Sequence, residues 1–337
     1  MSNVQALATA LSPGRPLLKW AGGKRQLLPA LRRFYPIAFT RYIEPFFGSG
    51  AVFFDLQAAG RLADRQAWLV DDNADLIGCY RMLMSRIDDV IAELRLLAAG
   101  HAAGGDRFYY DVRDNRFNPK RAGSSAYTPE LAAMLIYLNR TGFNGLFRLN
   151  RAGEFNVPVG RYTNPRIVDE PHLRQVAAAL RSRGVTLVHG SFEGALLEAG
   201  KGDFVYCDPP YAPISRTACF ANYTATGFTP ADQKRLQEGL IAAATRGAHV
   251  VLSNSSASEI VQLYSTDTAR RAQLRIERVA ARRAINSRGD SRGAVTELVI
   301  TNVVKPRMLK AYAPAIQTSV RQLGHANASR RSDSKDT

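Results

Sequence analysis

One alternation of patterns near the start of the chain constrains the fold most strongly. An apolar segment at 41–46 is typical of a strand, and it ends in a glycine turn at 48–50. A helical pattern follows at 51–59, and a second strand pattern ends on the carboxylate of Asp71. Strand, glycine turn, helix, strand and acid in this order open a doubly wound α/β domain. We therefore expect a Rossmann-like α/β core with a ligand at the carboxyl ends of its strands.

The rest of the chain extends this pattern and interrupts it. Further strands are expected at 185–188, 203–207, 249–253 and 296–303, and helices at 23–34, 73–99, 129–139 and 230–244. Residues 140–162 are dense in glycine, asparagine and aromatic side chains, which indicates turns and a hairpin. Strands on both sides of a block of helices and loops predict an inserted domain. The predicted parts are a discontinuous core at 1–73 and 169–308, an inserted helical and hairpin domain at 74–168, and a basic mobile tail at 309–337.

Charge and composition limit the class of protein. The 337 residues contain 45 Lys and Arg against 29 Asp and Glu, a net charge of +16, which favours a polyanionic partner and nucleic acid above all. The chain has no apolar run long enough to cross a membrane and no secretory signal pattern, so we expect a cytoplasmic protein without a membrane partner. Three widely spaced cysteines and five histidines without ligand spacing predict no metal site.

The glycine turn and Asp71 together suggest the kind of ligand. Glycines let the backbone approach a ligand closely, and an acid at the end of the next strand can accept hydrogen bonds from both ribose hydroxyls. The turn holds only two glycines and no phosphate-binding GK[ST] motif follows it. This favours a nucleoside ligand without phosphates. The simpler interpretation is a tight turn that needs glycine for its backbone alone.

A second motif, DPPY at 208–211, follows an apolar strand. Two prolines often mean no more than a rigid turn. Here the carboxylate of Asp208 and the carbonyl of Pro209 would also place two acceptors side by side, which suits one planar NH₂ group. Tyr211 would supply a ring on which a planar base can stack.

Two further blocks carry mixed signals. LLKWAGGK at 17–24 places Trp20 beside a glycine turn between two lysines, which is consistent with N-terminal packing or with a ligand lid. LNRTGFNGLFR at 138–148 and GEFNVPVGRY at 153–162 set arginine, asparagine and aromatic residues on a glycine-rich frame. That composition suits base-edge hydrogen bonding and wedging between bases, and it is equally found in ordinary polar hairpins.

Taken together, these blocks and EPFFGSG at 44–50 resemble the Dam-type DNA adenine N6-methyltransferases of the D12 class, with FxGxG and DPPY motifs. The resemblance spans about residues 16–304, with the blocks in the family's order and spacing. It implies a Rossmann-like methyltransferase core with an inserted DNA-recognition domain, S-adenosylmethionine as cofactor and double-stranded DNA as partner. It also implies adenine within GATC as the usual target.

The resemblance assigns roles to individual residues. The expected cofactor contacts are Trp20, Lys24, Phe46, Gly48, Gly50, Asp71, Ser191, Phe192 and Asp208. The expected catalytic residues are Asp208, Pro209 and Tyr211. The expected DNA contacts are Lys19, Phe143, Asn144, Leu146, Arg148, Pro158, Arg161 and Tyr162. Phe143 stands where the family commonly has tyrosine, which keeps a wedge and removes a polar contact.

The expected reaction is a direct methyl transfer to a flipped adenine. Its N6 amino group would donate to Asp208 and to the carbonyl of Pro209 while Tyr211 stacks on the ring. Arg148 could donate two hydrogen bonds to a guanine. We expect a monomer or a weak dimer.

Three alternatives remain at this point. RNA adenine and a glutamine side chain carry NH₂ groups of the same planar geometry, although the glutamine enzymes favour asparagine before Pro-Pro-Tyr. A DNA-binding regulator without turnover is a third possibility. The cysteine beside the motif, Cys207, is expected to be packed rather than nucleophilic. The sequence leaves open whether the role is restriction protection, repair or regulation.

Overall fold

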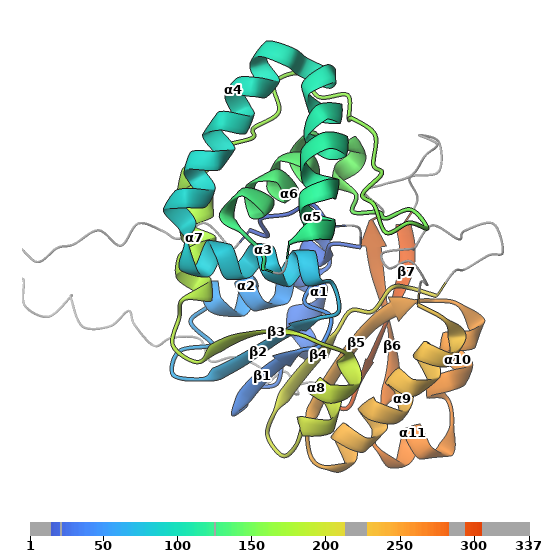
Figure 1. Cartoon of the computed structure of the whole chain (residues 1–337). Helices are drawn as coiled ribbons and strands as arrows, with labels where there is room; N and C mark the ends of the chain where they lie inside the picture. The colour runs from blue at the N-terminus through green and yellow to red at the C-terminus, as the bar shows by residue number, and fades with distance from the viewer. Residues whose placement is uncertain (1–14, 21, 125, 213–227, 283–293, 305–337) are drawn as a thin grey trace, which may run out of the picture. The chain divides into compact units, whose positions relative to one another are not determined.

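The computed structural model describes residues 15–304 apart from 21, 125, 213–227 and 283–293. In these residues seven strands form one sheet in the order β3-β2-β1-β4-β5-β7-β6 (Figure 1). Its strands are β1 (Arg41–Glu44), β2 (Gln66–Asp71), β3 (Val185–His189), β4 (Phe204–Cys207), β5 (His249–Ser255), β6 (Arg275–Arg282) and β7 (Ala294–Thr301). β1 to β5 pair in parallel, and β7 pairs antiparallel with both β5 and β6. The chain is therefore a Rossmann-like α/β protein, as the sequence predicted.

The helices cover both faces of this sheet. They are α1 (Leu28–Leu31), α2 (Ala51–Ala58), α3 (Ala74–Ser85), α4 (Ile87–Asp111), α5 (Asn118–Gly123), α6 (Pro129–Thr141), α7 (Glu170–Leu180), α8 (Phe192–Glu198), α9 (Pro230–Thr245), α10 (Ser258–Tyr264) and α11 (Asp267–Arg271). Successive side chains of a strand point to opposite faces of the sheet, so they pack in two different cores. Tyr42 and Tyr206 join α1–α4, α6 and α7 in one core, and Ile43 and Val205 join α8–α11 in the other. Figure 1 shows where these helices lie around the sheet.

The strand order places a topological switch between β1 and β4. The chain runs from β1 to β2 on one side, and from β4 to β5 on the other. In open α/β sheets, ligands bind beyond the carboxyl ends of the strands at such a point. The glycine turn follows β1 and the DPPY motif follows β4, so both predicted motifs border the switch.

Several predicted elements have different bounds. The single helix expected at 23–34 is a series of short turns around α1, because Pro29 has no N–H for a continuous hydrogen-bond ladder. The helix expected at 73–99 is broken at Arg86, whose φ/ψ of −136° and 41° are not helical. α4 continues to Asp111 through a kink at Gly105, whose φ/ψ are 51° and −131°. The sequence did not reveal α5, α7, α8, α10, α11 or β6. β6 pairs with one neighbour only, and its exposed edge carries charged residues that obscure the strand pattern.

Residues 141–160 pair in antiparallel fashion without forming regular strands. The N–H of Phe143 donates to the carbonyl of Pro158 at 2.8 Å, and the N–H of Asn156 donates to that of Arg148 at 3.1 Å. Isolated bridges join Gly142 to Val159 and Leu149 to Phe155. The hairpin predicted at 140–162 is therefore present as a paired loop. The division into domains at 74 and 168 stays a prediction, and the predicted tail at 309–337 lies outside the described residues.

Candidate active site

The glycine turn after β1 is tied to the end of β2. The N–H of Gly48 donates to Oδ2 of Asp71 at 2.8 Å, and the N–H of Asn73 donates to Oδ1 of the same carboxylate at 2.9 Å. Gly50 has φ of 68°, and a Cβ added there would lie 2.5 Å from the ring of Phe47. Only glycine fits this position without displacing the ring. The turn therefore holds the Asp71 carboxylate in place at the edge of the sheet.

Aromatic rings border the turn on two sides. Phe46 stacks on Phe192 with ring centres 5.2 Å apart and planes at 23°, and Phe228 packs against both rings. On the other side, a Cβ added to Gly48 would lie 3.2 Å from the ring of Trp20, so the tryptophan lies directly against the turn. The structure thus brings these predicted cofactor residues together with Asp71. Ser191 is the N-cap residue of α8, immediately before Phe192, and is exposed.

The DPPY motif meets Lys24 at the carboxyl end of β4. Nζ of Lys24 lies 2.8 Å from Oδ1 of Asp208 and 4.4 Å from the centre of the Tyr211 ring. It also donates to the carbonyl of Gly22 at 2.5 Å. The Lys24 side chain is 6% exposed and that of Asp208 is 19% exposed. Lys24, predicted as a cofactor contact, therefore lies against the predicted catalytic residues.

Polar side chains at the end of β5 and on α9 hold this motif. Ser253 donates to Oδ1 of Asp208 at 2.9 Å. Gln233 donates to the carbonyl of Pro210 at 3.1 Å, and Asn254 donates in turn to Gln233 at 3.1 Å. The loop that carries Asp208 is thus fixed from two elements. Pro209 is buried beside it.

Burial and charge act against each other on the carboxylates of this site. Burial raises the pKa of Asp208, while the Lys24 ammonium and the Ser253 hydroxyl lower it in part. Burial raises the pKa of Asp71 to about 6, against the opposing effect of the N–H groups of Gly48 and Asn73. The pKa of Glu44, buried at the end of β1, is raised well above its usual value by burial. Perturbed carboxylates at one sheet edge are typical of a functional site.

A buried asparagine joins the N-terminal segment to the paired loop. The N–H of Lys19 donates to Oδ1 of Asn139 at 2.9 Å, and the amide of Asn139 donates to the carbonyls of Lys19 at 2.7 Å and Gly145 at 2.8 Å. The Lys19 ammonium lies 4.2 Å from the centre of the Tyr162 ring. These contacts bring Lys19 and Tyr162, both predicted DNA contacts, to one surface.

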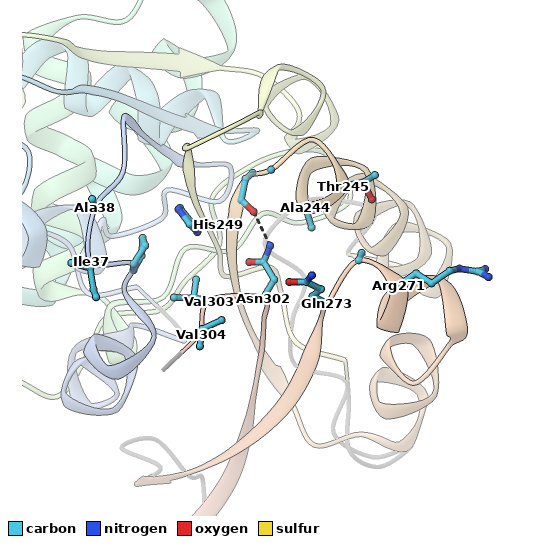
Figure 2. Close-up of a pocket in the computed structure, with 14 residues that line it drawn as sticks. Ile37, Ala38, Ala244, Thr245, His249, Arg271, Gln273, Asn302, Val303 and Val304 are labelled. Carbon is cyan, nitrogen blue, oxygen red and sulfur yellow. Dashed lines mark hydrogen bonds between the residues drawn. The ribbon is translucent and has the colours of Figure 1, made fainter. Parts of the chain in front are cut away.

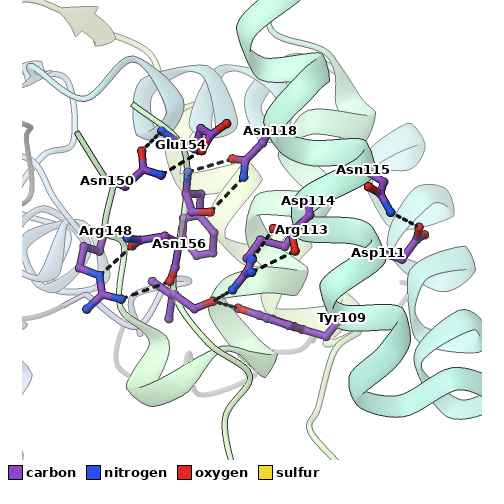
Figure 3. Close-up of polar contacts among 12 residues, drawn as sticks. Tyr109, Asp111, Arg113, Asp114, Asn115, Asn118, Arg148, Asn150, Glu154 and Asn156 are labelled. Carbon is purple, nitrogen blue, oxygen red and sulfur yellow. Dashed lines mark hydrogen bonds and ion pairs between the residues drawn. The ribbon is translucent and has the colours of Figure 1, made fainter. Parts of the chain in front are cut away.

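The other predicted DNA contacts lie along the same paired loop. Nε of Arg148 donates to Oδ1 of Asn156 at 2.8 Å, and its Nη2 donates to the carbonyl of Asn156 at 3.2 Å (Figure 3). Behind this pair, Tyr109 and Arg113 donate to the carbonyl of Val157 at 2.9 and 3.0 Å. The predicted contacts that are exposed here are Phe143, Asn144, Arg148, Pro158, Arg161 and Tyr162, and Leu146 is half-buried. The loop therefore presents its arginines and aromatics on a frame held by helices α4 and α6.

The sequence interpretation missed the residues that support the motifs. Ser253, Asn254, Gln233, Asn139 and Glu297 each bond to a predicted site residue or its loop. A polar run at 253–256 directly after the apolar part of β5 was a usable signal for two of them. The others lie on helices or on β7, where nothing in the local sequence indicates the site.

One cavity among the described residues lies away from this edge. A cavity of about 670 Å³ opens at the amino end of β5, between His249 and Val304 (Figure 2). There Asn302 bonds to the backbone of Ala248 and Val250 at 2.8 Å each. Cys207 is buried, and its pKa is raised well above the usual value by burial. Among the described residues, no cluster of metal-ligating side chains occurs and no helix is long and apolar enough to span a membrane.

A Rossmann-like sheet with the glycine turn and the DPPY motif at its switch point is the arrangement of an α/β methyltransferase. The model of the D12 class N6 adenine-specific DNA methyltransferases matches residues 20–285. The chain belongs to this family, as the motifs predicted, and it is an adenine-specific DNA methyltransferase.

Relatives of known name align with most of the chain. It is 38% identical to the type II methyltransferase M1.LlaDCHI of Lactococcus lactis subsp. cremoris, over 86% of this chain and 95% of the relative. It is 37% identical to the type II methyltransferase M.MjaIII of Methanocaldococcus jannaschii, over 86% and 99%. The DNA adenine methylase of Escherichia coli K12 is 34% identical over 86% and 95%.

Proposed function

We propose that this chain transfers the methyl group of S-adenosylmethionine to N6 of an adenine flipped out of duplex DNA, within GATC. The observation that carries the chemistry is the position of Lys24. A nitrogen donor there contacts the Asp208 carboxylate and lies over the face of Tyr211. The same carboxylate would accept from the amino group of a target adenine, and the same ring face would stack on its base.

The residues at the glycine turn fit S-adenosylmethionine. The Asp71 carboxylate at the end of β2 suits ribose hydroxyls, and the Phe46–Phe192 pair offers apolar ring surface for an adenine. Gly48 and Gly50 keep side chains out of the turn, where either Cβ would meet an aromatic ring. When bound, this donor supplies a methyl group activated on a sulfonium.

Asp208 and Tyr211 act on the target base. The carboxylate and the carbonyl of Pro209 accept the two N–H groups of N6, which turns the nitrogen lone pair toward the methyl carbon. Tyr211 stacks on the base and keeps it in the pocket. The nitrogen would gain a C–N bond as the C–S bond of the sulfonium breaks to leave a neutral thioether, and it would lose one proton, for which Asp208 is the adjacent acceptor. Positioning and electrostatics do most of this work.

Before the base enters, Lys24 compensates the buried charge of Asp208. Isolated buried carboxylates are costly, and an ammonium at 2.8 Å keeps this one ionised. The base must displace the ammonium from at least part of this contact. Ser253 holds Oδ1 of Asp208 throughout, so the carboxylate stays oriented.

Sequence choice is assigned to the paired loop at 141–160. Phe143 is 47% exposed at the tip of the turn. Its apolar ring is thus suited to insert as a wedge between bases. Arg148, held by Asn156, can offer a guanidinium to guanine. The GATC assignment rests on the likeness of this loop to the Dam-type motif.

Methyl transfer from labelled S-adenosylmethionine tests the proposal. Two duplexes that differ only in GATC and GTTC are compared, and products are digested to nucleosides. N6-methyladenine in the GATC duplex alone is expected. Methylation of both duplexes would overturn the site and retain the reaction. If neither duplex is labelled although S-adenosylmethionine still binds, the result would favour another recognition sequence or a DNA-binding protein without turnover.

A further inference from the structure

Tyr211 is held from a strand that the DPPY motif does not include. Its hydroxyl donates to Oε2 of Glu297 at 2.7 Å, across 86 positions of the chain. Burial and the nearby carboxylates of Asp208 and Glu297 raise the pKa of the Tyr211 phenol well above its usual value, so it keeps its proton. The contact is therefore a charge-assisted O–H···O⁻ bond, which is short and strong.

The sheet register fixes the glutamate at the site. Glu297 on β7 lies opposite Ser255 at the carboxyl end of β5, two residues beyond Ser253, which holds Asp208. The side chains of positions 253 and 255 lie on one face of β5 because strand side chains alternate. Thus β5 holds the Asp208 carboxylate through Ser253, and the neighbouring β7 holds the Tyr211 ring through Glu297.

We propose that Glu297 is a positioning residue for the methyl-transfer reaction, which fixes the Tyr211 ring in the orientation that stacks on the target base. The inference rests on the proposed function of this site. Tyr211 contacts Lys24 through its ring face and Glu297 through its hydroxyl. The hydroxyl bond limits rotation and displacement of the ring in its plane. Without it, the ring keeps its contact with Lys24 and loses its fixed position.

The negative charge of Glu297 adds an electronic effect. A hydrogen bond to a carboxylate polarises the phenol and makes the ring face more negative. Such a face attracts the ammonium of Lys24 in the free enzyme. It also suits the positive charge that develops on N6 as the new bond forms. Glutamine at position 297 would keep the acceptor and remove the charge.

A double-mutant cycle tests this coupling under single-turnover conditions on the GATC duplex. Glu297→Ala and Tyr211→Phe should each slow methyl transfer about 10-fold, with DNA affinity unchanged. The double variant should also be about 10-fold slow, because both changes remove one bond. Glu297→Gln should fall between the wild type and Glu297→Ala. Thr296→Ala, exposed on the other face of β7, is the matched control and should keep the wild-type rate.

Three results would overturn the inference. They are a wild-type rate for Glu297→Ala, losses that multiply in the double variant, and a Glu297→Gln enzyme as slow as Glu297→Ala at equal melting temperature. Each presupposes that the wild type methylates adenine. A wild-type enzyme that transfers no methyl group would instead refute the proposed function, so the two failures are distinguishable.

Discussion

Lys24 and Asp208 form an ion pair at the centre of the site, with Nζ 2.8 Å from Oδ1 and both side chains largely buried. The ammonium follows a glycine turn near the N-terminus, whereas the carboxylate follows β4. Opposite charge at this distance favours the ionised carboxyl, which burial disfavours. The pair therefore decides the pH range in which Asp208 can accept a hydrogen bond.

Replacement of Lys24 by methionine should move the acid limb of activity. Without the ammonium the pKa of Asp208 rises further, so the carboxylate is protonated at higher pH and activity is lost there. We expect the acid limb of kcat to shift upward by about one pH unit or more. A pH–rate profile measures this shift. The exposed Lys234→Met on α9 is the control, and coincident acid limbs for wild type and Lys24→Met would contradict the prediction.

Binding of S-adenosylmethionine should depend on pH through the ionisation of Asp71. Burial raises the pKa of Asp71 to about 6, and the ionised carboxylate is the form that accepts hydroxyl donors. Affinity for S-adenosylmethionine should thus be constant above this pH and fall about tenfold per pH unit below it. Calorimetric titrations from about pH 5 to about pH 8 would measure this change. Asp71→Asn should bind S-adenosylmethionine weakly, with an affinity that does not change with pH. Equal affinities of the wild type at both ends of the pH range would refute the prediction.

Arg148→Ala should relax sequence choice more than it weakens binding. A bidentate contact to guanine is worth about 1–3 kcal/mol against a wrong base. We expect the ratio of kcat/KM for GATC over single-substituted sites to fall accordingly, with little change in affinity for unrelated DNA. Arg183→Ala, an exposed arginine beyond α7, provides the comparison. A uniform loss on all sequences would assign Arg148 to a phosphate.

Two glycine substitutions should have opposite effects on stability. Gly50→Ala places a Cβ 2.5 Å from the Phe47 ring at a φ of 68°, so we expect a loss of about 2 kcal/mol or more and weaker donor binding. Gly194→Ala, in α8 with open space around it, should gain about 0.5–1 kcal/mol. Denaturant unfolding measures both values. Equal stability of the two variants would show that the glycine turn tolerates a side chain.

Local sequence patterns predict much of the α/β core. The glycine turn and DPPY lie where parallel strands end, and alternation along the strands locates most of the sheet. β6 was missed because an edge strand with charged residues lacks that alternation. The break at Arg86 was missed because the helical periodicity of apolar residues does not reveal a change of backbone direction. Helix α7 was also missed, although Pro171 near its start was visible.

The chemical groups of the site can be read from the sequence, since turns, prolines and strand ends are set by neighbouring residues. Which of these groups meet depends on the tertiary fold. Lys24 pairs with Asp208, Asn139 joins the turn at Gly145 to Lys19, 120 positions away, and Glu297 holds Tyr211 across 86 positions. The contact between Glu297 and Tyr211 depends on strand order and register, because the sheet brings the ends of distant strands to one edge. The contacts of Lys19 and Lys24 depend on where the N-terminal segment packs. No local pattern encodes that meeting.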